Sequence, residues 1–145
     1  MVSKELAQQL KEAGLVWEAK THDFFVIPER GMDEHIFVVT DVMAHLELLK
    51  GWPVVTFHGT AEWALDYILT AEVIWLPSEA QIRARLENAL LGEADLKLVL
   101  TLQHPGYRCD IIYDNQPHSF TSVSASDAYG LALLHILEQH NHSHD

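Results

Sequence analysis

The last third of the chain constrains the fold most, because three strand-like segments and a helix follow one another there without a break. Residues 96–103 and 107–113 alternate apolar and polar side chains on either side of Pro105-Gly106, a pair typical of the centre of a type II turn. Residues 118–123 form a third such segment, and a capped helix is predicted over residues 126–139. The pattern predicts an antiparallel β-meander closed by a helix.

Four further helices and four short strands are predicted in the preceding residues. The clearest is a helix over residues 78–91, where Ser78-Glu79-Ala80-Gln81 forms a capping box ahead of apolar residues at helical spacing. The other predicted helices are residues 3–13, 41–50 and 61–70. The predicted strands are residues 23–28, 35–40, 53–58 and 73–76, of which the first two form a hairpin.

These elements predict a single α+β domain over residues 1–139, with a mostly antiparallel sheet and helices packed on its faces. A chain of 145 residues is long enough to bury about two thirds of its unfolded surface around one core. Residues 140–145 are expected to form a flexible, histidine-rich tail.

The charge balance argues against nucleic acid and membrane surfaces as partners. The chain carries 21 acidic residues against 9 basic ones, a formal charge of −12 that repels phosphate groups. A single cysteine, Cys109, excludes an internal disulfide, and the N-terminal residues lack the apolar stretch of a signal peptide. No apolar run approaches the ~20 residues that span a bilayer. A cytoplasmic protein is therefore expected.

A likeness to known proteins is confined to the last third of the chain. It rests on Ser126-Asp127-Ala128-Tyr129-Gly130-Leu131-Ala132-Leu133-Leu134, which follows a strand that contains Phe120. This passage resembles the C-terminal part of small uncharacterised bacterial and prophage-associated α/β sandwich proteins. The resemblance implies an α-β-α layered fold, and it carries over no catalytic motif.

Cys109 is one candidate nucleophile, because His104 and His118 lie close to it in the sequence. An imidazole beside a thiol can generate the thiolate that attacks a substrate. The alternative explanation is structural, since a free cysteine usually packs as a small buried hydrophobic residue. The alternation of residues 107–113 places Cys109 among mostly apolar neighbours and favours the structural role.

A second candidate catalytic group lies where the predicted strand ending at His58 meets a predicted helix. Glu62 or Asp66 could pair with His58 as a general acid and base. Thr60 as an ordinary helix cap explains the same residues without any catalysis.

Histidines suggest a metal site, because ten of them are present and imidazole is a common ligand of Zn²⁺ and Ni²⁺. Local density occurs only at the C-terminus, where His140, His142 and His144 alternate with other residues. A solvated chain end is the simpler explanation. No cofactor is predicted.

The sequence favours a noncatalytic binding or interaction module of the bacterial cytoplasm that forms a homodimer or binds another protein, and the resemblance implies a prophage-associated origin. Phosphate loops, dinucleotide fingerprints and nucleophile elbows are absent from the sequence. Two alternatives stay open. One is a small hydrolase or transferase using His58, Asp66 and Cys109, and the other is metal handling through the C-terminal histidines.

Overall fold

A computed structural model describes residues 1–28, 32–39, 44–49, 52–57, 67–69 and 73–143. The chain divides into two compact units, residues 1–15 with 77–145 and residues 16–76. We call them the helical unit and the strand unit and describe each by itself. Every strand pair in the described residues is antiparallel, and helices pack together with a sheet, so the predicted α+β class is confirmed. The boundaries of a single domain, residues 1–139, stay a prediction.

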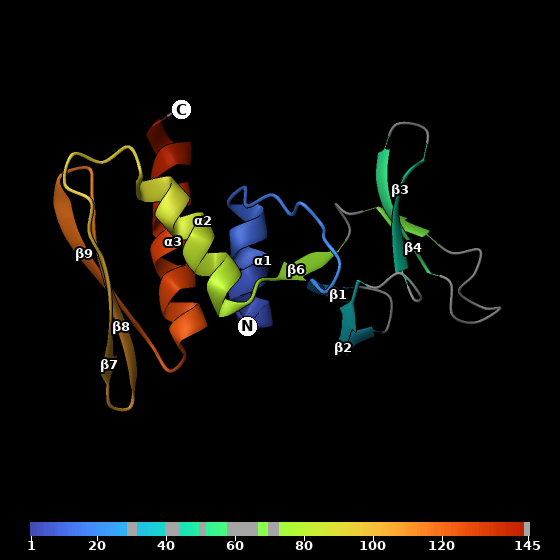
Figure 1. Ribbon diagram of the computed structural model, residues 1–145, viewed down its shortest axis with the longest axis horizontal. Coiled ribbons are helices and arrows are strands. Elements are labelled where there is room, and N and C mark those ends of the chain that lie inside the picture. The colour runs from blue at the N-terminus through green and yellow to red at the C-terminus, as the bar shows by residue number, and fades with distance from the viewer. Residues whose placement is uncertain (29–31, 40–43, 50–51, 58–66, 70–72, 144–145) are drawn as a thin grey trace. The chain divides into compact units, whose positions relative to one another are not determined.

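The helical unit contains three helices and one sheet among its described residues (Figure 1). The helices are α1 (Lys4–Glu12), α2 (Glu79–Leu90) and α3 (Ala125–Ser143). The strands β7 (Leu98–Gln103), β8 (Gly106–Tyr113) and β9 (Gln116–Ser122) form a sheet in the order β7-β8-β9. α3 packs against β8 and β9, and also against α1 and α2, so it forms the centre of this unit.

Local signals explain where α1 and α2 begin. The hydroxyl of Ser3 accepts a hydrogen bond from the N–H of Leu6, as a helix N-cap does. The capping box predicted before α2 is confirmed, since Ser78 Oγ accepts from the N–H of Gln81 and Gln81 Oε1 accepts from the N–H of Ser78. The apolar faces of the helices then meet, with Leu10, Ile82, Leu86 and Leu90 fully buried.

The meander predicted from the sequence is confirmed, with one change at its first turn. Gln103 pairs with Gly106, so His104 and Pro105 form the turn rather than Pro105 and Gly106. The second turn joins Tyr113 to Gln116 through Asp114 and Asn115, which have φ values of 55° and 60°. Positive φ at both central residues is typical of a two-residue hairpin turn of type I′.

The final helix is longer than predicted. α3 continues to Ser143, four residues beyond the predicted end, and the side-chain amide of Asn141 donates a 2.9 Å hydrogen bond to the carbonyl oxygen of Ala13. Residues 140–143 thus belong to α3, and residues 144–145 lie outside the described part. The flexibility of residues 140–145 stays a prediction.

The described residues of the strand unit form two small antiparallel sheets. One joins β1 (Phe24–Ile27), β2 (Met32–Val38) and β6 (Ile74–Leu76) in the order β2-β1-β6, and confirms the predicted hairpin. Its core is formed by Phe25, Ile27, Val39 and Val73. The second sheet joins β3 (Ala44–Leu49), β4 (Trp52–Phe57) and β5 (Tyr67–Leu69) in chain order.

Two predicted helices of the strand unit are wrong where the structure describes them. Residues 44–49 form β3, which pairs with β4 over its whole length, although residues 41–50 were predicted to be helical. Residues 67–69 form β5 instead of the end of a helix over residues 61–70, and residues 61–66 lie outside the described residues. Pairing with β4 satisfies the backbone groups of both segments. This stabilisation outweighs the helical preference that the spacing of their apolar residues indicates.

Candidate functional site

Of the candidate catalytic residues Cys109, His58, Glu62 and Asp66, Cys109 alone lies in the described part of the chain. His58, Glu62 and Asp66 fall outside it. Cys109 lies in β8, is completely buried, and has a thiol pKa raised to about 12 by burial and by the neighbouring Asp110. The thiol is therefore protonated at neutral pH and has the character of a core residue.

The histidines proposed to assist Cys109 have other surroundings. His104 lies exposed in the turn between β7 and β8. The ring of His118, on β9, lies beside those of Phe120 and His135. The structure thus assigns His118 to a different cluster from the one that the sequence suggested.

The C-terminal histidines do not form a metal centre in the described residues. His140 and His142 lie exposed in the last turn of α3, and His144 lies outside the described part. Across the described ranges, no group of three or more His, Cys, Asp and Glu side chains is placed to hold a metal ion.

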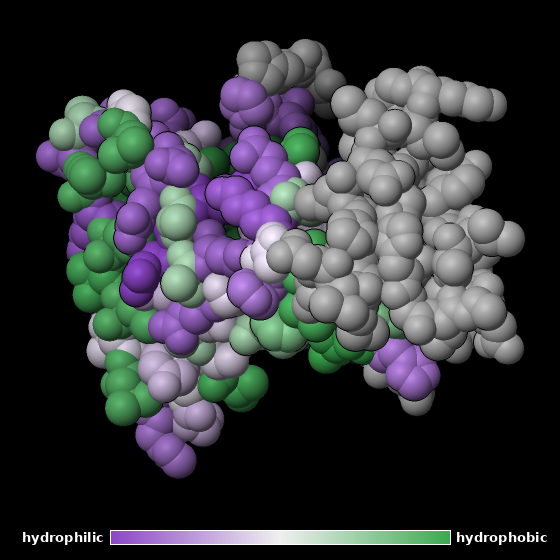
Figure 2. All heavy atoms as spheres, turned by 45° about the vertical axis from the view of Figure 1, so that its right-hand side comes forward, coloured by the Kyte–Doolittle hydropathy of each residue, from purple (hydrophilic) through white to green (hydrophobic). Residues whose placement is uncertain are grey.

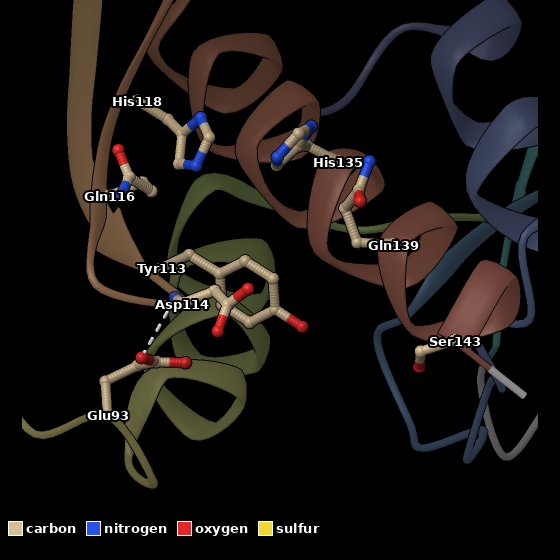
Figure 3. A pocket seen from close by; sticks show the side chains of 8 residues that line it. All are labelled: Glu93, Tyr113, Asp114, Gln116, His118, His135, Gln139 and Ser143. Atoms are coloured by element: carbon tan, nitrogen blue, oxygen red, sulfur yellow. Dashed lines mark hydrogen bonds between the residues drawn. The ribbon is translucent and has the colours of Figure 1, made fainter.

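The helical unit contains a pocket of about 530 Å³ between the β8–β9 hairpin, the segment after α2 and the C-terminal half of α3 (Figure 3). We call it the histidine pocket. It is lined by residues whose side chains each carry a polar group: Glu93, Tyr113, Asp114, Gln116, His118, His135, Gln139 and Ser143.

Two of the lining residues, His118 and His135, have imidazole rings that lie against one another. The ring centres of His118 and His135 lie 4.5 Å apart at an angle of 46°, and Figure 3 shows the rings turned toward one another. Phe120 lies 5.5 Å from the ring of His135, and Tyr113 meets the same ring edge-on at 6.4 Å. Aromatic packing therefore supports the position of His135.

Strand register brings His118 to this place. His118 is paired with Ile111, which is fully buried, so both residues lie on the face of the sheet that α3 covers. Gln116 and Phe120 share that face because side chains alternate along a strand. Gln139 follows His135 by four residues and so lies on the same side of α3.

Burial and neighbouring charges shift the pKa values of two groups in the pocket, His135 and Tyr113. Burial, and the neighbouring His118, lower the pKa of His135, and Glu138 opposes this shift. Burial, with the negative charges of Glu93 and Asp114, raises the pKa of Tyr113. Glu93 also accepts a 3.0 Å hydrogen bond from the backbone N–H of Asp114. At neutral pH the pocket thus combines a neutral imidazole and a neutral phenol with nearby carboxylates.

A second candidate surface is the outer edge of β7. Within the described residues, no strand pairs with this edge. Leu96, Val99 and Leu102 are 61%, 44% and 75% exposed, and the strand sequence from Leu98 to Gln103 carries no charge. Apolar residues gather on the side of the helical unit that carries this sheet (Figure 2). An open, apolar and uncharged edge is a template for pairing with another strand.

The opposite edge of the sheet is protected. Pro117 lies in β9, opposite Ile112, and has no N–H to donate. Because Tyr113 and Gln116 close a two-residue hairpin, alternation of the ladder makes position 117 one whose N–H would point outward. Strand addition is therefore favoured at β7 over β9.

No protein-family model, curated protein or solved structure matches this chain. The resemblance found in residues 126–134 stays a prediction. In the described ranges, none of the helices combines the length and apolar character needed to cross a bilayer.

Proposed function

We propose that this protein is a noncatalytic interaction module of the bacterial cytoplasm, and that it associates with a second copy of itself through β7. The observation that carries the proposal is the open, uncharged edge of that strand. A single, buried cysteine is compatible with a reducing compartment, since the chain cannot form an internal disulfide.

A second copy is the occupant that the edge favours. Antiparallel pairing of β7 with its equivalent is two-fold symmetric, so both copies would use the same surface and each would cover the other's apolar side chains. The result would be one six-stranded sheet, twice the three strands of a single copy. The formal charge of −12 repels another copy over most of the surface, whereas Leu98–Gln103 contributes no charge to the contact.

The buried, protonated thiol of Cys109 favours this proposal over a hydrolase or transferase. The other residues of the enzymatic alternative, His58 and Asp66, lie outside the described part.

Sedimentation velocity from low to high micromolar concentration tests the proposal. The wild-type chain should show a concentration-dependent dimer. The variant Leu102→Glu places a carboxylate on the β7 edge and should weaken dimerisation roughly tenfold, about 1.4 kcal/mol. Leu91→Glu is the matched control, because Leu91 is similarly exposed, 67% against 75%, but follows α2.

Three results would contradict the proposal. They are a wild-type chain that stays monomeric throughout, a dimer that tolerates Leu102→Glu, and a dimer that both substitutions weaken equally. The last result would indicate a general effect of added negative charge.

A further inference from the structure

We propose that His118 and His135 form a binding site for a divalent transition-metal ion, with Zn²⁺ as the representative ion. The site would join β9 to α3 inside the helical unit. It involves neither the β7 edge nor the histidines of the last turn of α3, so it stands apart from the proposed dimer.

The geometry of the two rings fits a shared ion. Zinc–nitrogen bonds of about 2.0–2.1 Å at a tetrahedral angle place two ligand nitrogens about 3.3 Å apart and the ring centres about 5.2 Å apart. The observed separation of the ring centres is 4.5 Å, and the rings are turned toward one another (Figure 3). The ring centres would have to move about 0.7 Å further apart to hold a tetrahedral ion, a change that rotation of the two side chains can supply.

The charges around the pocket favour a cation over an anion. Glu93 and Asp114 both line it and carry carboxylate groups. A phosphate or carboxylate ligand would meet the same carboxylates and be repelled.

Groups other than His, Cys, Asp and Glu side chains would fill the remaining coordination positions of the ion. The side chains of Gln116 and Gln139 line the pocket and carry carbonyl oxygens, and its volume of about 530 Å³ leaves room for water. Two imidazoles are fewer protein ligands than a structural zinc site has. We therefore expect reversible binding that exchanges with added chelator.

The experiment adds Zn²⁺ alone to the full chain and follows each histidine by its imidazole ¹⁵N resonances, with calorimetry for affinity. The resonances of His118 and His135 should shift together at one equivalent. His118→Gln and His135→Gln should each weaken binding at least tenfold. The control variant His140→Gln with His142→Gln should bind within about twofold of wild type.

The same experiment can contradict the proposed metal site. The proposal fails if Zn²⁺ shifts the resonances of His140 and His142 but leaves those of His118 and His135 in place, or if no imidazole responds. It also fails if the His140/His142 control loses binding. A circular dichroism spectrum identifies a His118 or His135 variant that does not fold. In that case the resonances of the wild-type protein still test the proposed metal site.

Discussion

The backbone of Gly106, at the start of β8, lies directly against the carbonyl group of Ser122, at the end of β9. A Cβ atom at position 106 would overlap that carbonyl oxygen and lie 2.8 Å from the Cα of Val123. The contact joins the two ends of the hairpin, and both contacting groups are backbone. Neither can move aside as a flexible side chain could.

Gly106→Ala should therefore destabilise the chain by about 2 kcal/mol, the usual cost of forcing atoms into a packed site. Chemical denaturation would measure the loss. Gly92→Ala is the control, since nothing lies within 4 Å of a Cβ at that position, and it should change stability by less than about 0.5 kcal/mol. Equal effects of the two substitutions would contradict the close approach.

The Cys109 thiol should be inert in the native protein. Complete burial and a pKa of about 12 leave almost no thiolate at about pH 8, so a disulfide reagent should react only as the chain unfolds. Absorbance after mixing with Ellman's reagent measures this, and denatured protein supplies the full signal. Native protein that reacts as fast as denatured protein would disprove the core assignment.

Asp110 should make stability pH-dependent through Ser119. The Ser119 hydroxyl donates to the Asp110 carboxylate and is the main reason that the pKa of Asp110 is lowered, with Arg108 contributing through its own 3.0 Å hydrogen bond. A lowered folded pKa means that this stabilisation is present above the unfolded pKa and lost as pH falls through the folded pKa. Ser119→Ala should cost about 0.5 to 1 kcal/mol at neutral pH, because the pair is partly solvated.

The difference between wild type and Ser119→Ala should shrink as Asp110 is protonated. Denaturation at about pH 7 and about pH 2 measures it. In an Asp110→Asn background, Ser119→Ala should show no such pH dependence. A difference that persists unchanged at acidic pH would rule out the charged hydrogen bond as its source.

The capping box of α2 should contribute measurably to stability. Ser78→Ala removes the acceptor of the 3.2 Å bond from the N–H of Gln81 and should cost about 1 kcal/mol. Ser78→Asp keeps an acceptor at the cap and should be nearly neutral, which thermal denaturation can check. A loss for aspartate as large as for alanine would show that the cap is not responsible.

Elements defined by local chemistry could be predicted from the sequence. The capping box at Ser78 satisfies backbone groups within a few residues of itself, so its outcome does not depend on distant partners. The β-meander could also be predicted, because its three strands follow one another in the chain.

The strand β3 could not be predicted from its own sequence. In Ala44-His45-Leu46-Glu47-Leu48-Leu49, the apolar residues fit a helical spacing as well as an alternating one. Its register with β4 decides between the two, and the spacing within one segment holds no information on that partner.

The histidine pair was missed because its two members come from a strand and a helix. A usable signal existed on the strand, since the Asp114-Asn115 turn sets the register that pairs His118 with buried Ile111. Nothing in the spacing of α3 identifies His135 as its partner, because that requires the packing of the helix on the sheet.

Hydrogen exchange at β7 tests the central claim, self-association through this edge, most directly. Because Gln103 and Gly106 close the hairpin, alternation of the ladder leaves the N–H groups of Leu98, Leu100 and Leu102 pointing away from β8. Their exchange should slow as protein concentration rises, and Leu102→Glu should move this slowing to a roughly tenfold higher concentration. Exchange at these amides that is fast at every concentration, in a sample that sediments as a dimer, would contradict the account.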